Sequence, residues 1–433
     1  MFKLVMNKLC KFKVIIFIII FLSGIILWYF RFLMLLGLFK NPHGENIWFG
    51  DFHVYYNAAS LYLNGGQVYS NTGYFYPPLS LILFLPVAHL SFEQACLLMG
   101  IFNLLLLISI PLVISRILQH YGTQLSKVEL FLIFLAIFLF YPVSTSFIAG
   151  QINILTLFLI IAFYYYLFVW DKKIVASLFL GIATMIKVWP VILVFLNFVT
   201  KRAEGFFARY CSIMVILSLM SLGLFGIHLH FDFLKAFLDF QSIPFVPSDE
   251  VLHPKDALDT NASPFNSIFK LLSLFEVNNL CDFQIIFGFK LIFVVFILYY
   301  FHKLHKLSRN NNNYELDILA FTFLIISVLI ISNRTWIYYT SFLVLSFMLA
   351  IYVLKLNVLE KSLLATTIAL LSFQQYIVTL SNMTGGIIKS AVYIASPTTY
   401  AYLIFLTPPL TRLILYKPER VFCIFTPILF LKF

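Results

Sequence analysis

The sequence predicts an all-α protein, a polytopic bundle of transmembrane helices that forms one integral membrane domain over residues 1–433. Hydrophobic residues make up 62% of the chain and charged residues only 11%, whereas soluble domains contain about 25% charged residues. The mean hydropathy is +0.96. Apolar runs of about 20 residues, the length that crosses a bilayer as a helix, recur along the chain.

These runs predict about ten full spans. We place them at residues 14–38, 93–118, 127–148, 151–170, 206–227, 283–301, 315–332, 337–356, 362–380 and 390–415. Two other apolar stretches do not fit as simple spans. Residues 79–90 are too short to cross and predict a re-entrant or interfacial helix, and residues 174–200 predict a hairpin of two half-helices bent at Pro190.

The basic residues indicate the orientation. The net charge of +11 comes from short clusters between apolar runs and forms no continuous stripe, so we expect no nucleic-acid partner. With ten spans, most Lys and Arg residues lie in inner loops, which predicts a cytoplasmic N-terminus and a multi-pass protein of the cytoplasmic membrane. The first apolar run lacks a convincing cleavage site and is expected to remain as a span. Loops 40–76 and 228–282 would then form the external, substrate-facing side.

A rival topology makes 79–90 a true span and 174–200 a single span. In that topology Lys172 and Lys173 lie on the external side of the membrane, and Gln151 lies on the cytoplasmic face. The positive-inside rule favours the first topology.

Two polar motifs lie inside almost unbroken apolar sequence, Gly150-Gln151-Ile152-Asn153 and Lys187-Val188-Trp189-Pro190. Buried amide and ammonium groups are costly in lipid unless they face a cavity or a ligand. Lys187 is therefore a candidate to bind an anionic group; the alternative is snorkelling or pairing with a carboxylate of the bundle. Gln151 and Asn153 are candidates to bind substrate hydroxyls; the alternative is helix capping and interhelical hydrogen bonding.

Three further residues at the predicted external side are candidates. Asp51 follows the first span and could act as a base, although it could equally cap a short helix or be solvated. Tyr76 precedes Pro77-Pro78 and is a candidate for substrate binding or an interfacial aromatic anchor. Arg334, at the outer end of a span, could bind an anion or simply contact lipid headgroups. The histidines and the five cysteines show no metal-ligand spacing, so we expect neither a metal site nor a cofactor.

Several of these elements, taken in order, resemble glycosyltransferase family 87, membrane enzymes of GT-C architecture that use polyprenyl-phosphate sugars. The residues that carry the resemblance are Asp51-Phe52 with Tyr55-Tyr56, Gly66 to Tyr69, Tyr76-Pro77-Pro78, Gly150 to Asn153, and Gly181 with Lys187 to Pro190. The match covers the first 200 residues well and the rest only loosely. Asn261-Ala262-Ser263 and Trp336 to Tyr339 depart from the family pattern.

The resemblance implies a GT-C bundle with an externally open active site and an inverting hexosyl transfer, most simply of mannose, from a polyprenyl phosphate to a glycan or glycolipid acceptor. Asp51 matches the position of the base. The chemistry is consistent, because one carboxylate suffices to deprotonate an acceptor alcohol and a phosphate leaving group needs positive charge, not a proton. Two other functions remain open: a secondary transporter with Lys187 as counter-charge, and a non-catalytic assembly or lipid-scrambling component.

Overall fold

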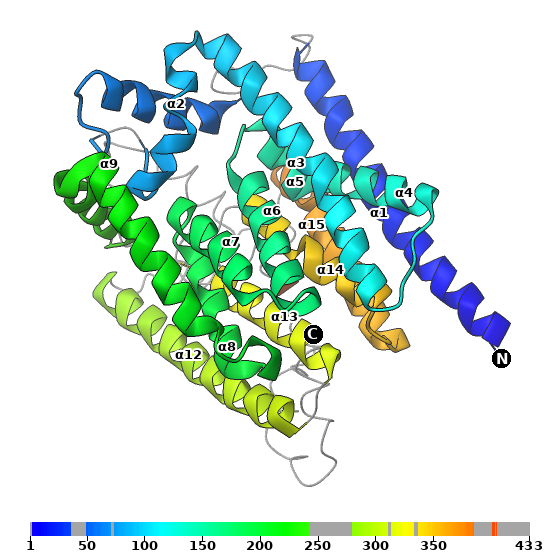
Figure 1. Cartoon of the computed structure of the whole chain (residues 1–433). Helices are drawn as coiled ribbons and strands as arrows, with labels where there is room; N and C mark the ends of the chain where they lie inside the picture. The colour runs from blue at the N-terminus through cyan, green and yellow to red at the C-terminus, as the bar shows by residue number, and fades with distance from the viewer. Residues whose placement is uncertain are drawn as a thin grey trace.

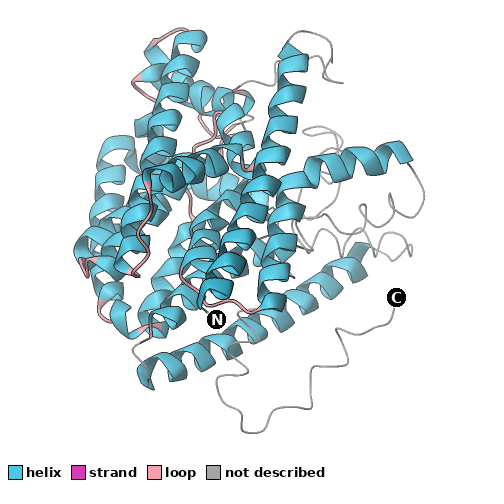
Figure 2. Ribbon diagram, turned by 90° about the vertical axis from the view of Figure 1, so that its right-hand side faces the viewer, coloured by secondary structure: helices cyan, strands magenta, loops and turns pink. Residues whose placement is uncertain are grey.

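The computed structural model describes residues 2–35, 49–70, 73–242, 279–310, 313–332, 337–384, 401–402 and 404. Within these ranges the regular secondary structure is entirely helical (Figures 1 and 2). The helices pack side by side into one bundle, with α6 and α7 near its middle and α2 at one end (Figure 1). The predicted all-helical membrane class is therefore confirmed.

The elements alternate between long helices and short or broken ones. The first half contains α1 (Phe2–Leu35), α2 (Gly50–Leu63), η1 (Pro78–Leu83), η2 (Val87–His89), α3 (Phe92–His120), α4 (Lys127–Leu139), α5 (Tyr141–Ile148), α6 (Asn153–Tyr164), η3 (Tyr165–Val169) and α7 (Lys173–Ile186). The second half contains η4 (Trp189–Phe195), α8 (Leu196–Val199), η5 (Lys201–Ala203), α9 (Phe206–Ser242), α12 (Asn279–Asn310), α13 (Tyr314–Ile331), η6 (Ile337–Leu343), α14 (Val344–Tyr352) and α15 (Val358–Thr384).

Ten full spans are not confirmed. Five described helices are long and apolar enough to cross a membrane, and a sixth span is possible if the bent pair α4 and α5 counts as one. The five candidate spans are Phe12–Tyr29, Phe92–His120, Phe206–Leu238, Gly288–Ser308 and Tyr314–Ile331. The segments expected at 151–170 and 337–356 form shorter apolar helices, and the span expected at 390–415 lies almost wholly outside the described residues.

The two segments that did not fit as simple spans are broken. Residues 79–90 form the 3₁₀ helices η1 and η2 instead of one continuous helix. In residues 174–200, α7 ends at Ile186 and the chain resumes helical form at Trp189, so the break falls at Lys187, before the predicted bend at Pro190. In a continuous helix Pro190 would have no amide to donate to the carbonyl of Ile186, and its ring would clash with that carbonyl, which is consistent with α7 ending at Ile186.

The predicted external loops contain helix. Residues 40–76 include α2, and the described part of 228–282 continues α9 as far as Ser242. Gly226 in α9 has φ 71°, which bends the chain there. Beyond this bend, Phe233 lies against Tyr69, with ring centroids 5.9 Å apart. The second half of α9 therefore covers the segment that follows α2.

Local sequence explains where α3 and α4 begin. Ser91 and Ser126 each accept a hydrogen bond from the backbone amide three residues later, and the side chains of Gln94 and Glu129 accept one from the backbone amide of the cap residue. Each is a capping box, which satisfies amides that have no partner within the helix. The bend of 64° between α4 and α5 follows because Pro142 occupies the first turn of α5.

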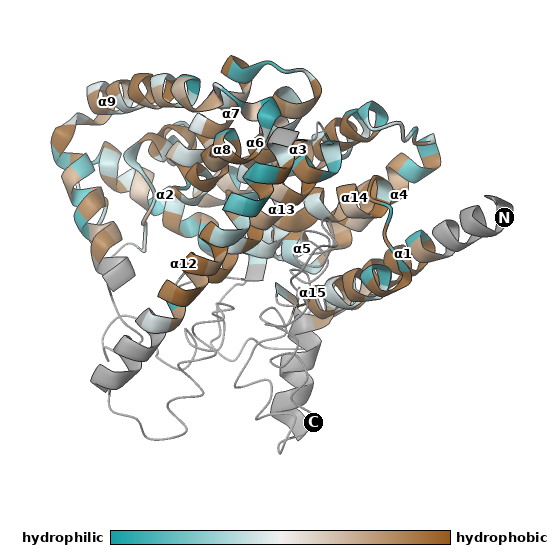
Figure 3. Ribbon diagram, turned by 90° about the horizontal axis from the view of Figure 1, so that it is seen from below, coloured by the Kyte–Doolittle hydropathy of each residue, from teal (hydrophilic) through white to brown (hydrophobic). Residues whose placement is uncertain are grey.

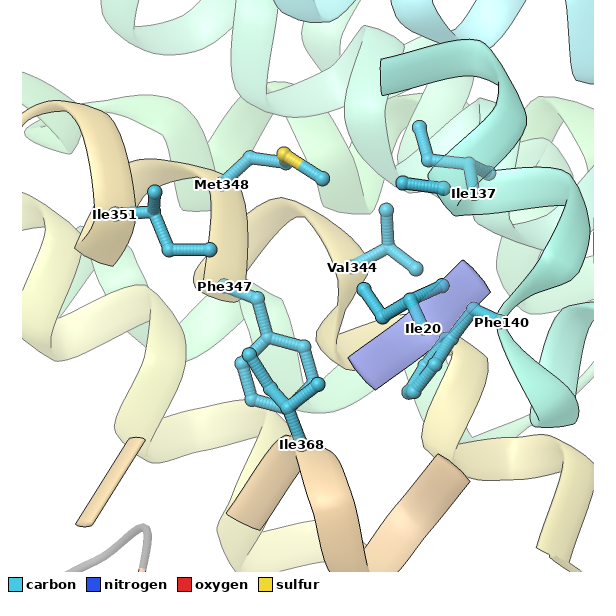
Figure 4. A pocket seen from close by; sticks show the side chains of 9 residues that line it. Ile20, Ile137, Phe140, Val344, Phe347, Met348, Ile351 and Ile368 are labelled. Atoms are coloured by element: carbon cyan, nitrogen blue, oxygen red, sulfur yellow. The ribbon is translucent and has the colours of Figure 1, made fainter. Parts of the chain in front are cut away.

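The outer helices carry apolar side chains on their exposed faces, whereas α13 is mostly buried. Figure 3 shows apolar residues along α1, α9 and α12. This distribution is typical of a bundle whose outer surface faces lipid. Figure 4 shows an apolar hollow between α1, α4, α5, α14 and α15, lined by Ile20, Phe140, Phe347, Met348, Ile368 and neighbouring apolar side chains. It offers no polar side chain to a sugar or a phosphate.

Candidate active site

The start of α2 is joined to the turn between α5 and α6. The amide of Phe49 donates to the carbonyl of Ile148 at 2.9 Å, and the amide of Phe52 donates to that of Ala149 at 3.1 Å. Gly150 in this turn has φ 66°, and a Cβ there would lie 2.5 Å from the Phe49 ring and 2.7 Å from the Cβ of Phe52. Only glycine fits this close approach of two chain segments.

This junction places Asp51 beside Gln151. The Gln151 Nε2 group donates a hydrogen bond to Oδ2 of the half-buried Asp51 carboxylate. Burial raises the pKa of Asp51 above its usual value, while the Gln151 hydrogen bond and the charge of Lys187 lower it. Asp51 is thus a carboxylate with increased basicity that still has a partner for its ionised form.

A chain of hydrogen bonds continues from Gln151 into the core. The Tyr55 hydroxyl donates to Oε1 of Gln151 at 2.7 Å, and the hydroxyls of Tyr55 and Tyr76 are 3.0 Å apart. The Tyr69 hydroxyl donates to the backbone carbonyl of Tyr76 at 2.8 Å. Tyr55 and Gln151 are buried and Tyr76 is partly buried. Tyr76 is therefore fixed by polar contacts on two sides.

Lys187 lies at the break after α7 and is buried. Its Nζ donates to Oδ1 of Asn153, at the start of α6. The same Nζ is 4.3 Å from the ring centroid of Tyr339 and 5.4 Å from that of Tyr76. These rings stabilise the cation through their π faces. The lysine is therefore surrounded by aromatic rings and a neutral amide.

Asp51 and Lys187 lie in the same cluster, linked through Gln151, Tyr55 and Tyr76. Among the described residues, however, neither of them takes part in a direct ion pair. The carboxylate is hydrogen-bonded to Gln151 and the ammonium to Asn153, two residues apart in one turn. The arrangement thus holds the two opposite charges near each other without letting them neutralise each other directly.

The cluster contains two buried donors without a partner among the residues that the structure describes. Nδ2 of Asn153 and Nε1 of Trp189 are inaccessible to solvent and make no hydrogen bond to any of these residues. Trp189 packs against Phe342, with centroids 4.5 Å apart, and Phe342 packs against Tyr339. An unpaired buried donor is costly, so these two N–H groups are available to donate to a ligand oxygen.

Five of the six residues predicted to form the site lie in this cluster: Asp51, Tyr76, Gln151, Asn153 and Lys187. Arg334 lies outside the described residues. Sequence reasoning did not select Tyr55 or Tyr339 as site residues. Tyr55 carried a signal, since it follows Asp51 by four residues and so shares its helix face. For Tyr339 the sequence provided no comparable signal beyond its position in the segment that follows Trp336.

No group of three or more His, Cys, Asp or Glu side chains that could hold a metal ion occurs in the described part of the chain. The side chains that the site offers for chemistry are an aspartate, a lysine and neutral hydrogen-bond donors. An aspartate can accept a proton from an alcohol. A buried lysine and an amide can bind an anionic oxygen.

The fold and this cluster define a helical membrane protein with an internal polar site. The model of glycosyltransferase family 87 matches residues 74–330, which is more than half of the 433-residue chain. The chain therefore belongs to glycosyltransferase family 87, and the resemblance predicted from its motifs is confirmed. It is a membrane glycosyltransferase. No curated protein matches the chain. Tyr76, Gln151, Asn153 and Lys187 lie within the matched residues, and Asp51 precedes them.

Proposed function

We propose that the protein transfers a hexose from a polyprenyl-phosphate donor to a glycan or glycolipid acceptor on the external face of the cytoplasmic membrane, with inversion at the anomeric carbon. Mannose is the first sugar to test. The observation that carries the proposal is the placement of Asp51 and Lys187 in one cluster, linked through Gln151, Tyr55 and Tyr76 and, among the described residues, without a direct ion pair. Membership of a glycosyltransferase family favours transfer over transport or a purely structural role.

In the proposed reaction Asp51 is the general base. Its carboxylate takes the proton of the acceptor hydroxyl as that oxygen forms a bond to the anomeric carbon. The bond between the anomeric carbon and the phosphate oxygen breaks, and its electron pair leaves with the polyprenyl phosphate. Attack opposite the leaving group inverts the configuration, so one carboxylate is sufficient and no covalent sugar–enzyme intermediate is needed.

Lys187 would bind the phosphate. A buried ammonium without a carboxylate partner is costly, and a phosphate oxygen would supply the missing charge. The leaving group gains negative charge as the bond breaks, so a fixed cation stabilises the transition state more than the ground state. The unpaired Nδ2 of Asn153 can donate to the same anion or to a sugar hydroxyl. Arg334 remains a proposed second contact to the phosphate.

Gln151 and Tyr76 would hold the sugar near the base. Gln151 Nε2 binds Asp51, and Tyr76 lies between that pair and Lys187 through its contacts to Tyr55 and to the lysine. A hydroxyl group of the sugar that reaches Tyr76 would therefore lie between the proposed base and the proposed phosphate site. This position suits the sugar in a transfer from phosphate to alcohol.

The test is transfer by the purified full-length protein, in nanodiscs, from a panel of radiolabelled polyprenyl-phosphate sugars to a membrane-glycolipid extract. Asp51→Asn should lower the transfer rate at least about 100-fold, as expected for loss of a general base. The matched control is Asp171→Asn, which removes an exposed carboxylate that pairs with Lys173 at 3.5 Å. Asp171 has φ 49°, a conformation that asparagine also tolerates.

Transfer by the control at the wild-type rate together with loss in Asp51→Asn would support the assignment. If Asp51→Asn retains the wild-type rate, Asp51 is not the base. Solute uptake into proteoliposomes without consumption of any donor in the panel would instead support a transporter.

A further inference from the structure

We propose that Tyr55 is a positioning residue for the base: its hydroxyl holds the Gln151 amide in the one orientation that donates to Asp51. The proposal rests on the proposed function, because it takes Asp51 to be the base. In the proposed reaction Tyr55 contacts no reacting atom. It acts through Gln151, and its effect is to keep Asp51 ionised and correctly aimed.

The orientation follows from counting donors. A glutamine amide has one oxygen and one NH₂ group, and an ionised carboxylate only accepts. The carboxylate therefore takes the NH₂ group, which leaves Oε1 of Gln151 facing Tyr55, and Tyr55 donates its single hydroxyl proton to that oxygen at 2.7 Å. Turning the amide over would bring Oε1 against the carboxylate, where two oxygens repel each other.

The same count extends to Tyr76. Because the proton of Tyr55 is used on Gln151, the contact of 3.0 Å between the two tyrosine hydroxyls requires Tyr76 to be the donor. The donors therefore all point one way, from Tyr76 through Tyr55 and Gln151 to Asp51. Hydrogen bonds in such a chain polarise one another, so the last donor, on Gln151, is strengthened.

Packing fixes the Tyr55 hydroxyl in place. The side chain is 1% exposed and stacks on Phe84 with centroids 4.8 Å apart and an angle of 10° between the rings. Tyr76 and Tyr74 meet it edge-on, at 5.1 and 6.4 Å. Tyr55 lies four residues after Asp51 in α2, so both face the turn that carries Gln151. The ring cannot move without disturbing this core.

Several charged or titratable groups face Asp51 from the elements around it: Lys187 after α7, Tyr76 before η1, Tyr338 and Tyr339 in η6, and Tyr55 in α2. Lys187 lowers the pKa of Asp51 through its charge. Burial raises the pKa of Tyr55 well above its usual value, so its hydroxyl stays a neutral donor. Its influence on Asp51 is therefore exerted through Gln151.

The test compares Tyr55→Phe with Tyr56→Phe, both assayed as full-length protein for transfer between pH 5 and 9. Tyr56 is the adjacent tyrosine in α2, and its hydroxyl donates to the backbone carbonyl of Leu90 at 2.7 Å, away from Gln151. Tyr55→Phe should lower kcat about 5- to 10-fold at neutral pH, with little change in KM for the donor. The acidic limb of the pH profile should move up by about half a unit to one unit, because a weakened hydrogen bond to the carboxylate raises its pKa.

A double-mutant cycle separates this role from a packing defect. If Tyr55 acts through Gln151, then Tyr55→Phe adds no further loss in kcat to Gln151→Met. Additive losses, or an acidic limb of Tyr55→Phe that coincides with that of Tyr56→Phe, would overturn the proposal. If Tyr55→Phe does not fold, the pH–rate profile of Gln151→Met is the test. An upward shift of its acidic limb supports the hydrogen bond to Asp51 on which the proposal rests. An unchanged acidic limb overturns the proposal.

The outcome is distinguishable from failure of the proposed function. If Asp51→Asn keeps the wild-type transfer rate, Asp51 is not the base and the proposed function fails with it. If Asp51→Asn is inactive but the acidic limb of the Tyr55→Phe pH–rate profile is not shifted, Asp51 remains the proposed base. Only the assignment of Tyr55 as its positioning residue is then wrong.

Discussion

At the scale of single residues, the unusual feature is a buried lysine whose polar partner is a neutral amide. Lys187 donates to Asn153 and lies near the rings of Tyr339 and Tyr76. A cation placed this way can still attract an incoming anion, because among the described residues no carboxylate forms a direct ion pair with it. The same residue also ends α7, since the break in the helix is at Lys187.

Lys187→Met should therefore reduce kcat/KM for the polyprenyl-phosphate donor about 10- to 100-fold, the range expected for a lost charge-assisted hydrogen bond. Lys187→Arg should recover part of this loss, because it keeps the charge. The control is Lys173→Met at the other end of α7, where Nζ binds the carbonyl of Glu204. Initial rates over a range of donor concentrations measure the effect; equal losses in Lys187→Met and Lys173→Met would contradict it.

At the scale of elements, the site depends on one junction between α2 and the α5–α6 turn. Two backbone hydrogen bonds join Phe49 and Phe52 to this turn, and Gly150 allows the close approach. The junction explains why Asp51 in α2 meets Gln151, which follows it by 100 positions. It also explains why Gln151 and Asn153, two residues apart, serve the proposed base and the proposed phosphate site separately.

Gly150→Ala should disrupt this junction, because the new methyl group would meet the Phe49 ring while the backbone keeps a φ of 66°. We expect transfer to fall more than 10-fold and the unfolding temperature in detergent to fall by several degrees, since strain of this kind costs about 1–2 kcal/mol before any clash. Gly122→Ala is the matched control, with φ 84° and no atom within 4 Å of its Cβ position. Similar losses in the two variants would show that backbone strain, and not the junction, is responsible.

At the scale of the whole molecule, the site and the basic turns lie at opposite ends of the bundle. α6 begins at the site with Asn153, α7 returns to it at Lys187, and the turn between them carries Lys172 and Lys173. At that far end the hydroxyls of Tyr121, after α3, and Tyr164 are 2.9 Å apart. If the basic end is cytoplasmic, the Asp51 site opens on the external side, as the proposed function requires.

Thiol labelling of intact cells measures this orientation. In a cysteine-free background, Gln67→Cys, in the exposed segment after α2, should react with a membrane-impermeant maleimide. Glu204→Cys, exposed near Lys201 and Arg202, should react only after the membrane is permeabilised. The reverse pattern would place the site on the cytoplasmic face and contradict external transfer.

The sequence by itself determined the class of this protein. Its apolar content specifies a helical membrane protein, and the order of its polar motifs indicates the glycosyltransferase family. Composition and motif order do this because a bilayer excludes unpaired polar groups from most positions. The few polar residues that remain are therefore informative without a structure.

The tertiary structure decided which helices are long enough to cross and which polar groups meet. Apolar content alone did not reveal the break at Phe140, because a broken helix and a continuous one can bury the same side chains; the break in residues 174–200 was predicted, but at Pro190 and not at Lys187. Nor could it pair Asp51 with Gln151, 100 residues away, or identify Tyr55 as their common neighbour. Those contacts follow from the close packing of α2 against the turn at Gly150, a spatial relation that hydropathy does not encode.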